Sequence, residues 1–199
     1  MTDHTPSDHT PSDHTPSGHT PRDHAPTGPS PTGHPGAHPA VSVVLPGQGE
    51  TIALGTTRMR VLEDGTTTGH RIGFAESVLA PHTPGPPQHR HAQHDEGFYI
   101  LSGTVRFTVG HDSHDAPAGT LVVVPPGAPH TFANVTDQPA VMLSTFTPGR
   151  YVQYFRDLQD MLTDGRPLTP EANIAAMTPY ATHPATDFPA APPTRRPPR

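Results

Sequence analysis

Four side chains that can bind a metal ion lie in two short pieces of the sequence. His89, His91 and Glu96 belong to the first piece, and His130 lies in the second, after the rigid turn Pro125-Pro126-Gly127. On an extended strand His89 and His91 point to the same side, because side chains alternate between the two faces. Three neutral imidazoles and a carboxylate suit divalent first-row metals, which include iron, manganese, nickel, copper, cobalt and zinc. The sequence therefore predicts one divalent transition metal as the cofactor and leaves its identity open.

The amino-acid composition excludes several other chemistries. The 199 residues include no cysteine, which rules out disulfides, thiolate nucleophiles and iron–sulfur clusters. All basic residues are arginines, so the chain offers no lysine for a Schiff base or for pyridoxal phosphate. The net charge of −6 and the lack of a basic patch argue against nucleic acid as a partner. No segment resembles a membrane span or a signal peptide, so we expect a cytoplasmic protein that does not contact a membrane.

Both ends of the chain have compositions typical of disordered segments. The motif Asp-His-Thr-Pro-Ser occurs at residues 3–7, 8–12 and 13–17 and then decays, so residues 1–40 are predicted to be a disordered His/Pro repeat tail. Histidine tracts can collect metal ions, but the spacing here is wide, and we favour a solvated low-complexity extension. Residues 183–199 are rich in proline and arginine and are predicted to be a second disordered tail.

Between these tails the sequence alternates with a period of two and is interrupted by frequent turn signals. This rhythm is typical of an antiparallel β-sandwich or barrel, and we assign residues 41–149 to one all-β domain. A loop is expected over residues 110–119. The expected extended segments are 41–45, 51–62, 70–80, 97–102, 104–109, 120–124, 130–135 and 140–146.

A change of period after Gly149 predicts a C-terminal helical segment over residues 150–182. Apolar side chains recur at spacings of three and four from Tyr151 to Leu162, which predicts an amphipathic helix. A second, shorter helix is expected over residues 170–177, with a proline in its first turn. The apolar stripe of the first helix could bind a partner or cover the open end of the barrel, and we favour the cover.

The two pieces that contain the metal-binding residues closely resemble the two sequence motifs of the cupin family. In the first motif, His-x-His is followed by a glutamate and then by a glycine, as in His89-Arg90-His91, Glu96 and Gly103. The leading glycine departs from the pattern, since Gly85 stands closer to the first histidine than the usual spacer allows. The second motif is matched in full by Gly119, Pro125, Gly127, His130 and Asn134. The resemblance covers about residues 50–147.

This resemblance implies an all-β, cupin-type antiparallel β-barrel or jelly-roll with a metal held by His89, His91, Glu96 and His130. The helix after the barrel is reminiscent of single-domain cupins (monocupins) similar to quercetin dioxygenases, in which a substrate oxygen binds the metal and the glutamate ligand can take its proton. Carried over to this chain, the resemblance implies a dioxygenase for a small aromatic or enolisable substrate, with Glu96 as the catalytic residue. Cupins are often dimeric, so the expected assembly is a homodimer.

Two other functions use the same four ligands. The metal could act as a Lewis acid without dioxygen, as in an isomerase or a decarboxylase. Alternatively, the chain could be a non-catalytic module that binds a metal or a small ligand, because a fold does not fix a function. The sequence leaves both alternatives open beside the dioxygenase.

Alternation along the strand that begins near Glu96 predicts which neighbours face the site. Phe98 and Ile100 share the face of the glutamate and should line the cavity, whereas Tyr99 and Leu101 should point away from it. Other large apolar residues on these strands fill a core more often than they wall a pocket, and we expect this of Phe107, Phe132 and Met142.

The remaining polar candidates are expected to lie outside the site. His94 could be an alternative ligand or a hydrogen-bond donor to a ligand, but we favour a solvated loop histidine. Neighbouring proline, glycine or aspartate residues place three more histidines in loops, namely His82, His111 and His114. Four arginines on strands could bind an anionic substrate or lie on the solvated face, and alternation does not decide for Arg58, Arg60, Arg71 and Arg106.

Overall fold

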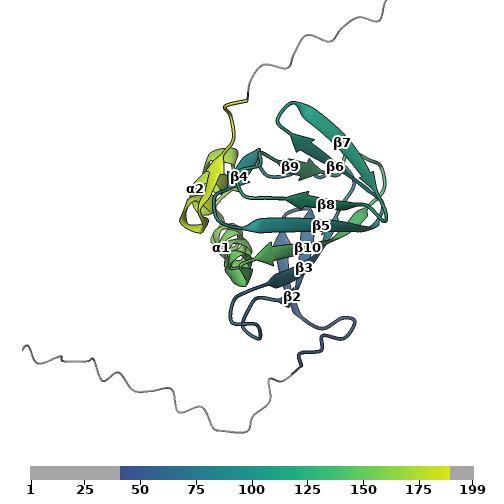
Figure 1. Ribbon diagram of the computed structural model, residues 1–199, viewed down its shortest axis with the longest axis vertical. Coiled ribbons are helices and arrows are strands. Elements are labelled where there is room, and N and C mark those ends of the chain that lie inside the picture. Colours follow the sequence, from purple (N-terminus) through teal and green to yellow (C-terminus); the bar gives the residue numbers. More distant parts are fainter. Residues whose placement is uncertain (1–40, 189–199) are drawn as a thin grey trace, which may run out of the picture. The chain divides into compact units, whose positions relative to one another are not determined.

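Three antiparallel sheets form the framework of residues 41–188, the part of the chain that this computed structural model describes. The largest sheet contains, in spatial order, β1 (Glu50–Leu54), β2 (Thr57–Glu63), β3 (Gly73–Leu79), β10 (Ala140–Thr147), β5 (Asp95–Ser102) and β8 (Leu121–Val124). A three-stranded sheet has the order β7 (Asp112–Pro117), β6 (Thr104–Val109) and β9 (Thr131–Ala133), and β11 (Thr182–Pro184) pairs with β4 (His89–His91). The sheets form a cupin-type jelly-roll (Figure 1) but do not join into one closed barrel.

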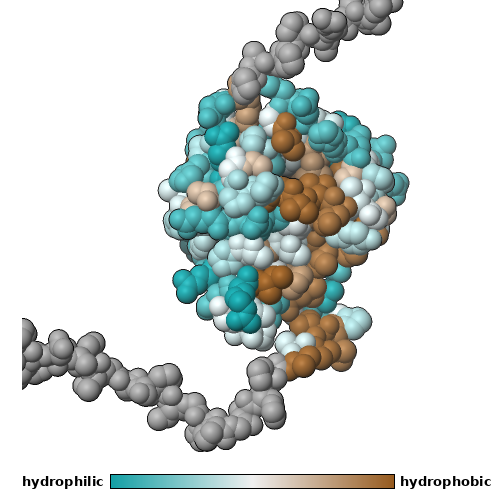
Figure 2. All heavy atoms as spheres, viewed as in Figure 1, coloured by the Kyte–Doolittle hydropathy of each residue, from teal (hydrophilic) through white to brown (hydrophobic). Residues whose placement is uncertain are grey.

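The six-stranded sheet has one buried face and one exposed face, as the period of two predicts. Every second residue of β10 is buried, and the same alternation runs along β3. Tyr99 and Leu101 are exposed on the other face, as expected, together with Val78, Leu121 and Val123. Figure 2 shows hydrophobic residues gathered over the region where β5 and β8 run in Figure 1.

The buried side chains form two clusters. The first, which we call the sheet-side cluster, lies between the six-stranded and three-stranded sheets and contains Leu79, Phe98, Ile100, Val105, Phe107, Ala116, Val124, Ala140 and Met142. The second, which we call the helix-side cluster, contains Ile52, Met59, Val61, Ala75, Phe146, Tyr151, Val152, Tyr154, Leu158 and Met177. Apolar burial in the two clusters is the main source of stability for this part of the chain.

Two helices follow the last strand of the large sheet. The 3-10 turn Gly149–Tyr151 leads into α1 (Val152–Thr163), and α2 (Pro170–Met177) is followed by the 3-10 turn Thr178–Tyr180. The buried face of α1 belongs to the helix-side cluster, so this helix covers the jelly-roll as predicted. Within residues 41–188 no helix has both the length and the hydropathy to cross a membrane.

Ion pairs and hydrogen bonds hold α1 against the first strands. The Arg156 guanidinium lies 2.6 Å from Glu50 and 2.8 Å from Asp64. The Ala53 amide donates a hydrogen bond of 2.8 Å to the Gln159 side chain. Because these contacts join residues about a hundred positions apart, they fix the helix relative to the edge of the large sheet.

The structure differs from the sequence prediction in the first two extended segments. Residues 41–45 form no strand, because no neighbouring strand pairs with them, and Val41, Val43 and Leu45 are exposed. The segment 51–62, which was expected to be continuous, is a hairpin whose strands are joined by a turn at Gly55-Thr56.

Two further strands lie where none is predicted. The expected loop 110–119 contains β7, a polar edge strand that pairs with β6 along its whole length. The expected C-terminal tail begins within β11, which pairs with β4. The described residues 183–188 therefore do not form a tail that separates from the jelly-roll at residue 183. The predicted tail at 1–40 and residues 189–199 lie outside the described residues.

Candidate metal centre

The first two histidines of the candidate site lie on β4, a three-residue strand with partners on both sides. On one side, β11 pairs with it in a register that places Thr182 opposite His91. On the other side, the amides and carbonyls of His89 and His130 exchange two hydrogen bonds of 3.0 and 2.8 Å. The bridge places the third histidine directly beside the first, although the two are far apart in sequence.

Turns at both ends of the site fix its backbone. The Gly127 amide donates a hydrogen bond of 2.7 Å to the His91 carbonyl, so the Pro125-Pro126-Gly127 turn is tied to β4. At Gly85 a Cβ atom would lie 1.5 Å from the Phe132 carbonyl oxygen, so only glycine allows this loop to approach β9. Although Gly85 stands closer to His89 than the motif's usual spacing, it lets the loop before His89 pack against β9.

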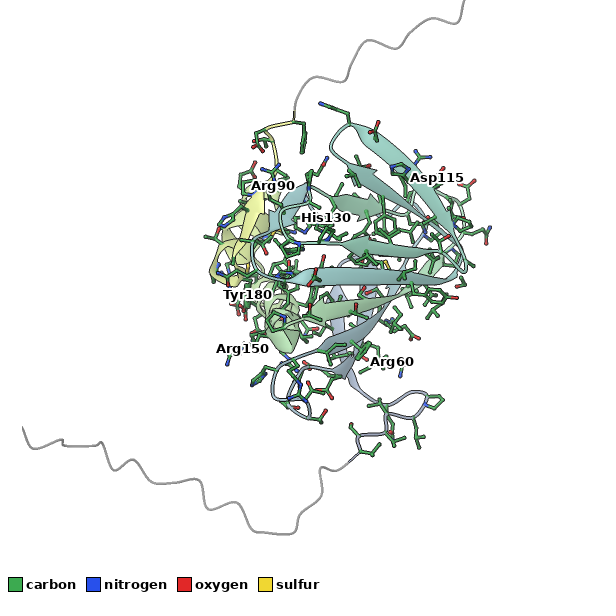
Figure 3. The ribbon with its side chains drawn as sticks, viewed as in Figure 1. Arg60, Arg90, Asp115, His130, Arg150 and Tyr180 are labelled. Atoms are coloured by element: carbon green, nitrogen blue, oxygen red, sulfur yellow. The ribbon has the colours of Figure 1, made fainter. Side chains whose placement is uncertain are left out.

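The structure brings all four predicted ligands together. His89, His91, Glu96 and His130 are buried, and each offers one ligand atom within 4.8 Å of the others. The His130 ring centroid lies 4.4 Å from that of His89 and 5.0 Å from that of His91. Figure 3 shows His130 in the interior of the jelly-roll, whereas Arg60 and Asp115 lie at its periphery.

Hydrogen bonds orient the three imidazoles so that one nitrogen of each ring is held away from the centre. The Nδ1 atom of His89 lies 2.8 Å from the Pro87 carbonyl oxygen, and that of His130 lies 3.2 Å from the Ala128 carbonyl oxygen. Because a carbonyl can only accept, both Nδ1 atoms carry the hydrogen and both Nε2 atoms keep a lone pair in the neutral ring.

The third imidazole is oriented by a hydroxyl group. His91 Nδ1 lies 2.8 Å from the Thr182 Oγ1 atom, which donates its own hydrogen to the Tyr180 carbonyl. The hydroxyl can therefore accept the hydrogen of His91 Nδ1, which leaves Nε2 of this ring as a lone-pair donor as well. An outer hydrogen bond of this kind is what fixes the ring orientation of metal-binding histidines.

The distances between the ligand atoms require a positive charge at the centre. Glu96 Oε2 lies 2.8 Å from His91 Nε2 and 3.1 Å from His130 Nε2. A carboxylate and a neutral imidazole with its hydrogen on Nδ1 would face each other here with lone pairs, which repel. Protons on both Nε2 atoms or one metal ion relieve this repulsion, and the donor set fits a divalent first-row metal.

The electrostatics of the site keep the ligands in their metal-binding forms. Burial raises the pKa of the Glu96 carboxyl, but when His130 and His91 carry protons on Nε2, their hydrogen bonds lower it by more, so the pKa lies well below its ordinary range. Burial, reinforced by the charge of His130, lowers the pKa of His89 to about 3. At neutral pH Glu96 is therefore ionised and His89 is neutral.

The prediction for His94 is wrong, because this residue is buried beside the ligands. Its ring centroid lies 3.8 Å from that of His91 and 4.4 Å from that of Tyr151. Burial lowers the pKa of His94 to about 4, so the ring is neutral. The chain turns inward between β4 and β5, and the sequence of this loop gives no signal for the turn. Tyr151 and Thr182 were likewise missed as neighbours of the site.

A cavity of about 640 Å³ opens on one side of the four ligands. His89 and Glu96 lie in its wall, which is otherwise formed mainly by apolar and aromatic side chains from the large sheet and from α1 and α2. Phe98 lines the cavity as predicted, whereas Ile100 is buried in the sheet-side cluster. Phe107 and Met142 fill the core as predicted, and Phe132 packs against it. Met142 and Phe132 line the cavity as well, whereas Phe107 does not.

The other polar candidates lie away from the cavity. Arg60 pairs with Glu76 at 3.2 Å, Arg106 pairs with Asp115 at 2.7 Å, and neither arginine lines the cavity. Arg58, Arg71, His82, His111 and His114 are exposed. The motif residue Asn134 is buried, and its amide donates hydrogen bonds to the carbonyls of Ala80 and Gln138, at 3.0 and 2.8 Å. Its role is therefore structural.

Comparisons with known proteins agree with this geometry. Residues 75–146, which include all four ligands, match the model of the Cupin domain family. No curated protein matches the chain significantly.

Several solved structures are similar to part of this chain at low sequence identity. A sugar phosphate isomerase of the cupin superfamily from Silicibacter pomeroyi is 25% identical over 47% of this chain and 60% of its own, with a TM-score of 0.43. An RmlC-like cupin from Shewanella frigidimarina is 20% identical over 57% of this chain and 96% of its own, with a TM-score of 0.49. The polyketide cyclase RemF from Streptomyces resistomycificus is 18% identical over 57% and 94%, with a TM-score of 0.49.

These proteins have different activities, and identities of this size transfer none of them to the present chain. What this chain shares with the family model is the matched segment, and that segment contains the four buried side chains that could hold a metal. Residues 75–146 are therefore similar to the Cupin domain family.

Proposed function

We propose that this protein is a metal-dependent dioxygenase that acts on a small aromatic or enolisable substrate. The observation that carries the proposal is that the cluster of four ligands adjoins a large, mainly apolar cavity, with His89 and Glu96 in the cavity wall. Three histidines and one glutamate leave one or two coordination positions of a transition metal for other ligands. A bound divalent metal would supply a Lewis acid for a substrate oxygen and a site at which dioxygen can react.

The walls of the cavity would bind and orient the substrate. Phe98, Phe132 and Phe146 present aromatic surfaces, and the side chains of Met59 and Met142 adapt to planar ligands. Enclosure between the sheet and the helices would exclude bulk water from the substrate. These features favour a flat apolar compound over a sugar.

Glu96 would hold the proton that the substrate loses. Both imidazole contacts of this carboxylate are made by Oε2, and the described residues make no hydrogen bond to Oε1. Since Glu96 also lines the cavity, Oε1 can accept a proton from a substrate hydroxyl. Its lowered pKa restricts this role to acidic hydroxyls such as those of enols.

Oxygen consumption tests the proposal. The protein is loaded in turn with iron, manganese, nickel, copper, cobalt or zinc and is supplied with a flavonol or a β-diketone in an oxygen electrode. We expect at least one redox-active metal to give oxygen uptake that matches substrate loss, and zinc, which has no redox chemistry, to give none. Glu96→Gln should reduce the rate in the active preparation, because an amide cannot take the proton and binds the metal less well than a carboxylate does.

The same experiment separates the alternatives. Substrate loss that continues without dioxygen would favour an isomerase or a decarboxylase that uses the metal as a Lewis acid. If the fully metallated protein converts no member of the substrate panel, the dioxygenase proposal is wrong and a non-catalytic binding module is favoured.

A further inference from the structure

One buried hydroxyl group in the cavity has no partner. Ser77, on β3, is 1% exposed, and its Oγ atom makes no hydrogen bond with any of the described residues. The residue lines the cavity, between Met59 on β2 and Met142 on β10. A buried hydroxyl without a partner is unfavourable, so Ser77 Oγ is available to hydrogen-bond with a molecule that enters the cavity.

A second serine lies between Ser77 and the metal ligands. Ser144, on β10, is buried, lines the cavity, and faces Phe98 across one strand pair and Ala75 across the other. On β5, Glu96 is two residues from Phe98, and on β3, Ser77 is two residues from Ala75.

The three polar residues therefore form one diagonal across the inward face of the sheet, from Glu96 through Ser144 to Ser77. Diagonal neighbours on adjacent strands are separated by about 7–8 Å, so the two steps together span roughly 15 Å between Cα atoms. Except for this line the inward face of β3, β10 and β5 is apolar. A ligand that follows the line meets the metal ligands at one end and a hydroxyl group at the other.

The charges around the cavity limit what can lie at the Ser77 end. The residues that line the cavity include no arginine, and the sequence contains no lysine. A carboxylate or phosphate group buried there would have no cation to compensate it. A hydroxyl or carbonyl group can exchange a hydrogen bond with serine without this cost.

From these observations we propose that Ser77 is a specificity-determining residue that binds an uncharged hydroxyl or carbonyl group at the far end of an elongated substrate. This substrate carries its metal-binding oxygens at one end, an aromatic body over the apolar wall, and a neutral polar group at the other end. Ser144 contacts the body between the two ends. The inference rests on the proposed function and adds the class of substrate, namely aromatic compounds of two or three rings with polar groups at both ends.

The competing explanation is that serine occurs at position 77 only because it is small. In that case alanine would serve equally well, and the hydroxyl would make no difference to any ligand. The two explanations are separated by comparing a ligand that carries polar groups beyond the chelating oxygens with one that does not.

Binding to the full-length zinc-loaded protein without dioxygen tests the inference. The probes are 3-hydroxyflavone, which has only the chelating oxygens, and kaempferol, which has further hydroxyl groups on the rings. Binding is followed by the absorbance change that accompanies chelation. We expect kaempferol to bind the unaltered protein more tightly than 3-hydroxyflavone. Ser77→Ala should weaken kaempferol binding roughly five- to tenfold, which is the effect of one neutral hydrogen bond, and leave 3-hydroxyflavone unchanged.

Ser102→Ala is the matched control, since this serine is exposed on β5, and it should change neither affinity. Thermal unfolding of each variant shows whether the fold is retained, and the comparison of the two probes on the unaltered protein does not depend on any variant. If Ser77→Ala binds both probes as the unaltered protein does, the role of Ser77 is wrong and the proposed function stands. If the zinc-loaded protein binds neither probe, the proposed function fails, and the inference fails with it.

Discussion

The two clusters of buried side chains differ in how completely they fill their space. The sheet-side cluster is closely packed, with Phe107 lying 5.3 Å from Phe98 between ring centroids, and most of its members touch no cavity. In the helix-side cluster most members, among them Tyr154, Leu158 and Met177, line the cavity. The same jelly-roll is thus solid on one side and hollow on the other.

The difference distinguishes a closely packed cluster, which stabilises the fold, from a cluster that surrounds the cavity beside the candidate metal site. Protein interiors are normally packed like organic crystals, and an unfilled volume forfeits contacts between side chains. A cavity of about 640 Å³ falls in the size range of small-molecule sites. Two of the candidate ligands, His89 and Glu96, lie in the wall of the hollow side.

The largest expected effect is the loss of the metal from the hollow side. His130→Ala removes one of the four metal ligands, and the remaining three should bind the ion too weakly to keep it. Metal retention after dialysis should therefore fall from near one ion per chain to near zero. Elemental analysis measures this. His114→Ala, which changes an exposed histidine on β7, is the matched control and should keep the metal.

The seven histidines within residues 1–40 need their own control. A chain that lacks these residues should keep its metal if the buried cluster is the main binding site. Metal content that falls with the deletion and survives His130→Ala would contradict the assignment of the site to the jelly-roll.

Most of the site could be predicted from the sequence because its signal is local. The alternation of His89 and His91 and the rigid turn before His130 are properties of a few neighbouring residues, and the structure brings these side chains together with Glu96. The neighbours that complete the site could not be predicted in this way. His94 depends on the inward path of one loop, and Thr182 depends on a pairing of strands about ninety residues apart.

In the fold, too, strands that follow from local alternation could be predicted, whereas strands that depend on a distant partner could not. Segments with strong alternation, such as β10 and β5, are strands as predicted. The polar residues of β7 carry no alternation, and this strand exists because β6 offers it hydrogen-bond partners. Residues 41–45 have the composition of a strand but lack a partner, so they form none.

A matched pair of leucines measures the difference in packing directly. Leu79 lies in the sheet-side cluster and does not line the cavity, whereas Leu158 lines it, and both are nearly fully buried. Leu79→Ala creates a new void in packed surroundings and should cost about 3–5 kcal/mol of unfolding free energy. Leu158→Ala enlarges an existing space and should cost about 2–3 kcal/mol. Urea unfolding of the two variants under the same metal conditions gives both values, and equal costs would contradict the comparison.

The smallest expected effect concerns the ion pair that holds α1 over the hollow side. A hydrogen bond from Arg156 lowers the pKa of Asp64 to about 2. Because the folded-state pKa lies below the unfolded one, the pair contributes stability above about pH 4, and this contribution is lost as the pH falls toward 2. Asp64→Asn should therefore cost less than about 1 kcal/mol at pH 7, and the difference should shrink between pH 4 and pH 3.

Chemical unfolding at several pH values measures this dependence. The control is Asp164→Asn, since Asp164 forms a more exposed pair with Arg166 and should give a smaller difference at every pH. A cost for Asp64→Asn that stays constant down to pH 3 would show that the ion pair does not stabilise the contact between α1 and the sheet.

Because β11 pairs with β4, the part of the chain that supports the candidate metal site extends beyond the segment that contains the sequence motifs. A fragment cut at the ends of the matched family segment, residues 75–146, would still contain every ligand. It would nevertheless lack the hydroxyl of Thr182 that turns His91 toward the centre and the strand that shields β4 from solvent. Protein engineers who transplant this candidate metal site should therefore carry the chain through β11, because the partner strand of β4 lies beyond the two helices.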